Sequence, residues 1–185
     1  MPDRKRRRRK ASGGSRAEGS PMGLSMAKVT LMVAASLGLA LALYLTLSRL
    51  PSFTSAITSS TASATGFLLR LLGADVSVKG SLLNATSFSF VVVPDCTPLA
   101  PFMLLAGAML AFPAPLRDKL LGLLVSGIFL SVLNLVRVMS LVYLGLYAPQ
   151  WLEAAHLVVW QSAMVLAGIL VFLWWMRRAV RAAPA

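Results

Sequence analysis

Four long apolar segments, separated by polar or basic stretches, limit what this chain can fold into. The first runs from Val29 to Leu47 without a charged residue. As a helix it would be about 28 Å long, close to the thickness of the hydrocarbon core of a bilayer. At 185 residues, 57% of them hydrophobic, the chain holds more apolar residue than a soluble domain of this length needs. The sequence therefore predicts an all-α integral membrane protein with about four transmembrane helices.

The apolar segments and the breaks between them give the expected spans, which are about 29–49, 97–112, 120–141 and 155–175. In the long segment 50–95, Pro51 is expected to break the first helix, and a Ser-, Thr- and Ala-rich stretch follows. Residues 67–72 could form a short interfacial helix. Apolar and polar residues then alternate, which is typical of half-buried strands. We expect a small extracytoplasmic β-hairpin over 74–93.

The basic residues indicate how the chain is oriented. The formal net charge is +12, and half of the 18 Lys and Arg residues lie within the first 28 positions. Residues 1–25 are expected to be a disordered tail at the anionic lipids of the cytoplasmic face. Nucleic acid is not an expected partner, because no aromatic or folded module accompanies the tail. The loop 113–119 and the tail 179–185 are also placed inside, so both termini are expected in the cytoplasm.

A cleaved signal peptide is the alternative interpretation of the first apolar segment. The basic start fits it, and Ala62-Ser63-Ala64 resembles a cleavage site. The segment is long for a signal peptide, however, and this tripeptide lies well past its end. An uncleaved membrane anchor is the favoured prediction.

Three residues with reactive or charged side chains are expected at one depth near the outer surface. They are Cys96, the only cysteine, at the start of the second span; Arg137, toward the outer end of the third; and His156, the only histidine, at the start of the fourth. A guanidinium inside a span is costly and usually faces the protein interior. Asn134, with Ser131 and Ser140, is expected to extend this polar face, although Arg137 could instead reach toward the lipid headgroups.

The cysteine also has two interpretations. An isolated buried Cys is commonly packing material. At the start of a helix and near a guanidinium, however, its thiol pKa should fall, an effect that the neighbouring Asp95 would oppose. His156 would then be a candidate general acid and base. Neither a metal nor another cofactor is expected, because one Cys and one His cannot complete a zinc site and Arg137 would repel the cation.

Three short motifs follow one another on successive spans: Pro94-Asp95-Cys96, then Asn134-Leu135-Val136-Arg137-Val138, then Ala155-His156-Leu157. In this order they resemble the exosortase/archaeosortase family over residues 26–178. The sequence around His156 is most similar to the exosortase H type. The resemblance implies a multi-spanning protein of the cytoplasmic membrane whose active site faces the periplasm.

The resemblance also implies an activity, that of a cysteine peptidase or transpeptidase. Its substrates would be exported, membrane-anchored proteins that end in a sorting signal, which consists of a short motif, a transmembrane helix and a basic cluster. Cys96 would be the nucleophile, Arg137 would stabilise the thiolate or the oxyanion, and His156 would be the acid and base. The expected partners are these proteins and membrane lipids. A non-catalytic assembly subunit and an anion-binding transporter component remain open alternatives, as does simple hydrolysis.

Overall fold

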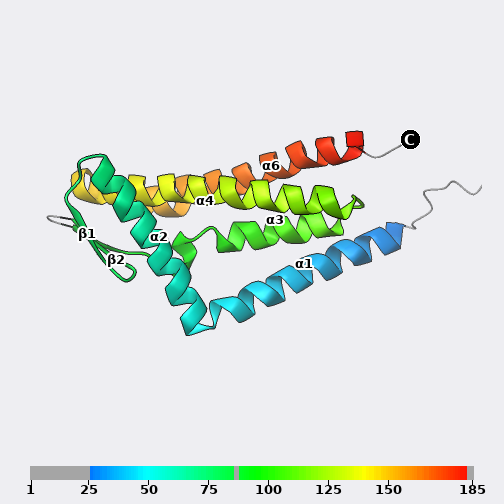
Figure 1. The fold of residues 1–185 in the computed structure, drawn as a ribbon, viewed down its shortest axis with the longest axis horizontal. Helices are drawn as coiled ribbons and strands as arrows, with labels where there is room; N and C mark the ends of the chain where they lie inside the picture. Colours follow the sequence, from blue (N-terminus) through cyan, green and yellow to red (C-terminus); the bar gives the residue numbers. More distant parts are fainter. Residues whose placement is uncertain (1–25, 86–87, 183–185) are drawn as a thin grey trace, which may run out of the picture.

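The computed structural model describes residues 26–85 and 88–182, which form a mostly helical fold elongated along one axis (Figure 1). Three helical segments are long and apolar enough to cross a membrane, namely Ala27–Ser48, Leu116–Tyr147 and Pro149–Arg181. They contain the helices α1 (Met26–Ser48), α4 (Leu116–Tyr147) and α6 (Trp160–Ala182). The fourth apolar helix, α3 (Leu99–Ala111), has only 13 residues. The predicted apolar helices are thus present, and α3 is the short one.

Helix α2 (Pro51–Leu71) covers the Ser-, Thr- and Ala-rich stretch after Pro51 together with most of residues 67–72, where the sequence suggested only a short helix. The proline does not continue the first helix but begins the second, in the first turn, where its missing N–H is not needed. The hydroxyls of Thr54 and Thr58 donate hydrogen bonds to carbonyls one turn earlier, at Leu50 and Thr54. The abundant Ser and Thr side chains are therefore compatible with a helix of 21 residues.

The predicted hairpin is a three-stranded antiparallel sheet of β1 (Val76–Lys79), β2 (Leu82–Ala85) and β3 (Phe88–Val91). The turn between β1 and β2 contains Gly80 with a φ of 59°, which explains the glycine there. The expectation of one hairpin was therefore one strand short. The residues between β2 and β3 lie outside the described part of the chain.

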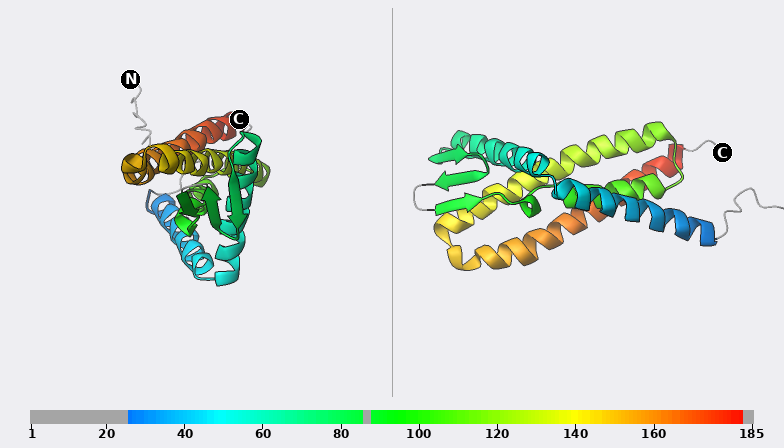
Figure 2. Two further views of the ribbon diagram at one scale, coloured as in Figure 1. Left: turned by 90° about the vertical axis from the view of Figure 1, so that its left-hand side faces the viewer. Right: turned by 90° about the horizontal axis from the view of Figure 1, so that it is seen from below.

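The sheet is fixed to the helices through a buried apolar cluster. Side chains from α2, the sheet and α4 form it, with Leu69, Leu83 and Val138 at most 1% exposed. Gly145 on α4 allows the Phe88 ring of β3 to approach so closely that an added Cβ would lie 2.4 Å from it. In Figure 2 the sheet lies beside α2, at the end of the molecule where α4 finishes.

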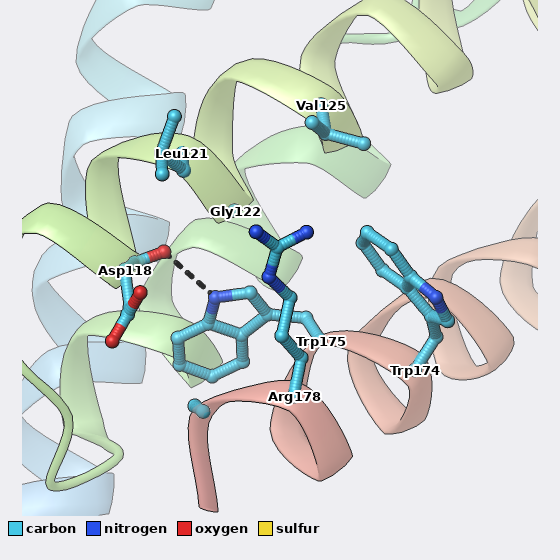
Figure 3. A pocket seen from close by; sticks show the side chains of 8 residues that line it. Asp118, Leu121, Gly122, Val125, Trp174, Trp175 and Arg178 are labelled. Carbon is cyan, nitrogen blue, oxygen red and sulfur yellow. Dashed lines mark hydrogen bonds between the residues drawn. The ribbon is translucent and has the colours of Figure 1, made fainter. Parts of the chain in front are cut away.

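The opposite end of the molecule is closed by a contact between α4 and α6 (Figure 3). The Trp175 ring is buried against Gly122, and its Nε1 donates a 2.8 Å hydrogen bond to the carbonyl of Asp118. Lys119 donates a bond of the same length to the carbonyl of Leu110, near the end of α3. The α3–α4 connection and the C-terminal end of α6 lie here, far from the sheet (Figure 1).

Candidate active site

A short 3₁₀ turn, η1 (Pro94–Cys96), carries the cysteine between the sheet and α3. The chain enters the turn in an extended conformation at Val93, whose carbonyl accepts a 2.8 Å hydrogen bond from the amide of Cys96. The hydroxyl of Thr97 donates a 2.6 Å bond to the carbonyl of Pro94. The Cys96 side chain, 1% exposed, is thus held in a defined turn at the end of α3 nearest the sheet.

His156 lies next to this thiol. The Cys96 Sγ atom is 3.7 Å from the His156 Nε2 atom, within hydrogen-bond range for sulfur, although 60 positions separate the two residues in the chain. The histidine belongs to a π-helical turn, η3 (Ala155–Val159), that precedes α6. Such turns insert one extra residue into a helix and are frequent at functional sites. The sequence patterns that we used do not reveal this turn.

Asn134 and Arg137 lie one helical turn apart on α4 and are 1% and 3% exposed. The Nδ2 atom of Asn134 donates a 2.8 Å hydrogen bond to the carbonyl of Cys96. Asn134 Oδ1 and Arg137 Nε, both buried, have no hydrogen-bond partner among the described residues. Asn134 thus contacts the turn that carries the thiol, and the charge of Arg137 acts on the same thiol.

The rest of the predicted polar face differs. Ser131 is exposed, and the hydroxyl of Ser140 donates a bond to the carbonyl of Arg137. Three-residue steps fall about 60° short of a full turn each, so Ser131 and Ser140 lie on opposite sides of the helix. The inward face instead follows Ser126, Leu130 and Asn134, at four-residue steps.

A cavity of about 710 Å³ opens beside Asp95 and His156, the neighbours of Cys96, and the buried Cys96 side chain does not line it. Asp95, Arg137, His156 and Gln161 line its polar part, and mostly apolar side chains of α3 and α6 line the remainder. Asp95 itself is exposed and precedes the nucleophile candidate directly, so it contributes negative charge at the rim of this cavity. Cys96, Arg137 and His156, predicted to share one depth, are thus brought to one place by η1, α4 and η3.

Burial has the largest effect on the thiol. It raises the pKa of Cys96 above its ordinary value, and Asp95 acts in the same direction. The hydrogen bond with the Val93 backbone and the Arg137 charge lower this pKa, but they do not compensate for the burial. The expected fall in the thiol pKa is therefore not found, because the apolar cluster around Cys96 disfavours the thiolate. At neutral pH the cysteine is a thiol that needs a base.

Comparison with known proteins identifies the family to which the chain belongs. Residues 20–177 match the sequence model of the family described as transmembrane exosortase (Exosortase_EpsH). No curated protein and no solved structure matches the chain. The matched region includes the whole site and most of the described residues. The class that the helices and the site indicate is a multi-pass membrane enzyme.

This chain belongs to the transmembrane exosortase family. The predicted family and the predicted fold class are thus confirmed. Family membership implies an enzyme that processes sorting signals. It leaves the roles of the individual site residues to the geometry and to experiment.

Proposed function

We propose that this chain is a cysteine peptidase or transpeptidase that cleaves the C-terminal sorting signal of exported proteins and passes the new carboxyl end to an acceptor. The observation that carries the proposal is the 3.7 Å approach between the Cys96 Sγ atom and the His156 Nε2 atom. It supplies a nucleophile and a base at one position, beside a buried guanidinium and at the end of a cavity.

In the first step Cys96 Sγ attacks the scissile carbonyl carbon, and its proton passes to His156 Nε2. The raised thiol pKa makes this transfer necessary, because little thiolate is present beforehand. The carbonyl oxygen becomes an oxyanion, which the Arg137 guanidinium stabilises. When the C–N bond breaks, His156 returns the proton to the departing amine, and a thioester to Cys96 remains.

In the second step an acceptor attacks the thioester. His156 removes a proton from the attacking amine or water, the C–S bond breaks, and the proton returns to the Cys96 sulfur. Asn134 is a positioning residue in this scheme. Its hydrogen bond to the Cys96 carbonyl fixes the turn that aims the thiol.

The proposal includes an orientation. The end of the molecule that holds the α3–α4 connection and the end of α6 is basic, with Arg117, Lys119, Arg177, Arg178 and Arg181. The positive-inside rule therefore favours a cytoplasmic location for this end. The site would then face the periplasm, from the cytoplasmic membrane of a bacterium with an outer membrane. Exported substrates meet the thiol on that side.

The test is to co-express the chain with an exported reporter protein. The reporter carries at its C-terminus a sorting signal taken from a protein encoded in the same genome. Cys96→Ala should abolish processing, and His156→Ala and Arg137→Ala should reduce it by about a hundredfold or more. Arg178→Ala, an exposed arginine at the other end of the molecule, is the control and should process normally. Normal processing by the Cys96 variant would refute covalent catalysis.

The same experiment addresses an anion-binding transporter component, for which the unpartnered Nε atom of Arg137 is the favouring observation. Such a protein would need Arg137 but neither Cys96 nor His156. A non-catalytic assembly subunit would tolerate all three substitutions.

A further inference from the structure

The cavity beside His156 continues along the molecule as an apolar groove between α3 and α6. Ala100, Leu104 and Ala108 line it on the α3 side, and Val165, Gly168 and Phe172 line it on the α6 side. Sixteen residues of helix separate Phe172 from His156, which corresponds to about 24 Å. On its α6 side the groove therefore extends from the candidate active site over most of the thickness of a hydrocarbon core, and on its α3 side it runs from Ala100 to Ala108, about 12 Å.

The groove is open and is not an internal packing seam. A Cβ atom added at Gly168 would meet nothing within 4 Å, and Leu104 and Val165 are more than half exposed. By contrast, a Cβ added at Gly107 would lie 2.9 Å from Ala40 of α1, and one at Gly127 would lie 3.3 Å from the Phe102 ring. The other faces of α3 are thus covered from within the molecule.

We propose that this groove binds the transmembrane helix of the sorting signal, with one face of that helix inserted between α3 and α6. The inference rests on the proposed function, which it extends by naming where the substrate docks. The length of the groove and its continuity with the candidate active site indicate this occupant. The groove joins the polar end formed by Arg137 and His156 without interruption, and a chain cleaved there must continue into the bilayer.

The lining fits a helix. Ala100, Ala108 and Gly168 allow a second backbone to approach closely, and the aliphatic side chains between them provide the ridges against which it packs. A soluble peptide would not need about 24 Å of apolar surface. Docking there would place the residues just outside the substrate helix at Cys96, so the cleavage position would be measured from the end of that helix.

The first test fills the groove. Gly168→Leu should slow processing of the membrane-anchored reporter by about tenfold or more, because the added side chain occupies the docking surface. Cleavage of a detergent-solubilised peptide that carries the motif without the helix should be unchanged. Gly38→Leu on α1 is the matched control, since a Cβ there also meets nothing within 4 Å, and it should process normally. Normal processing by Gly168→Leu, or equal loss of both reactions, would overturn the proposal.

The second test measures docking without cleavage. In the Cys96→Ala background, benzoylphenylalanine at Val165 should crosslink to the reporter helix, and the same probe at Val132, an exposed position of α4 outside the groove, should not. A crosslink specific to Val165 in a protein that never cleaves the reporter would refute the proposed function and keep the docking site. Crosslinks from Val165 to lipid alone would overturn the docking site, whatever the enzyme cleaves.

Discussion

The side-chain amide of Asn134 donates a hydrogen bond of 2.8 Å to the main-chain carbonyl of Cys96, so α4 fixes the turn that carries the thiol. Arg137 lies one turn further along the same helix. Helix α4 thus supplies both the residue that holds the turn of Cys96 and the charge that, in the proposed mechanism, would stabilise the oxyanion. Relative movement of α4 and η1 would disturb both at once.

Replacing Asn134 tests the positioning role. Asn134→Leu leaves the buried Cys96 carbonyl without its donor, at a cost of about 1–3 kcal/mol. We expect kcat for reporter processing to fall about tenfold or more while KM changes little, because the substrate does not contact this bond. Asn134→Ala also removes the donor, so it should behave like the Leu variant. A variant that changes KM alone would contradict the positioning role.

The thiol should react as a buried, protonated group. The alkylation rate of Cys96 by N-ethylmaleimide should rise with pH, with its midpoint above that of an exposed thiol, because burial raises its pKa. Ser77→Cys in the Cys96→Ala background provides the exposed reference on β1. In Arg137→Ala the midpoint should move higher still, because that charge lowers the thiol pKa. A midpoint at or below the reference would mean a preformed thiolate.

The same shift predicts how stability depends on pH. The folded-state pKa of Cys96 lies above the unfolded one, so its contribution is present below the unfolded pKa and is lost as pH rises through the folded pKa. In detergent, the unfolding temperature of the wild type should fall more between neutral and alkaline pH than that of Cys96→Ala. An identical fall in both proteins would count against a raised pKa.

The contact between Gly122 and Trp175 should tolerate no larger residue. A Cβ at position 122 would lie 2.3 Å from the Trp175 Nε1 atom, which donates to the Asp118 carbonyl (Figure 3). Gly122→Ala should therefore destabilise the fold by about 1–3 kcal/mol, measured as a lower unfolding temperature. Gly38→Ala, with open space around its Cβ, should have no such effect. Equal unfolding temperatures for the two variants would refute this packing.

A double-mutant cycle should couple Gly145 to Phe88. Gly145→Ala alone should displace the Phe88 ring and loosen β3, which leads into the turn of Cys96. In the Phe88→Ala background the same substitution should cost little, because the ring it meets is gone. Processing rate and unfolding temperature both measure the coupling, and strictly additive effects would show that the sheet is not fixed there.

Labelling of intact cells tests the orientation. With Cys96→Ala as background, Ser77→Cys on the sheet should react with a membrane-impermeant maleimide once the outer membrane is permeabilised. Arg117→Cys, at the other end of α4, should react only after the inner membrane is broken. The reverse pattern would place the site in the cytoplasm and refute the proposed access of exported substrates.

The sequence predicted well what depends on length and periodicity. The apolar helices lie where the apolar segments indicated them. The approach of Cys96 to His156 is what spans crossing one bilayer in alternating directions would produce. The sequence failed to predict the full length of α2, because the composition of that stretch is not typical of a helix. The Ser- and Thr-rich α2 lacks an apolar pattern, yet its hydroxyls bond to its own backbone.

Two further features depend on tertiary packing, which composition does not encode. The π turn at His156 inserts a residue without a distinct signature. The thiol pKa depends on how completely α2, the sheet and α4 enclose Cys96, and the effect of burial outweighs those of the Arg137 guanidinium and the Val93 hydrogen bond.

The shortness of α3 has a consequence for the surrounding lipid. Its 13 residues extend about 20 Å, some 10 Å less than a typical hydrocarbon core. The bilayer must become locally thinner to match α3, or water and headgroups must move toward Cys96. Either response brings the local polar boundary closer to Cys96. The turnover rate should therefore depend on acyl-chain length in reconstituted vesicles, and short-chain lipids should favour it.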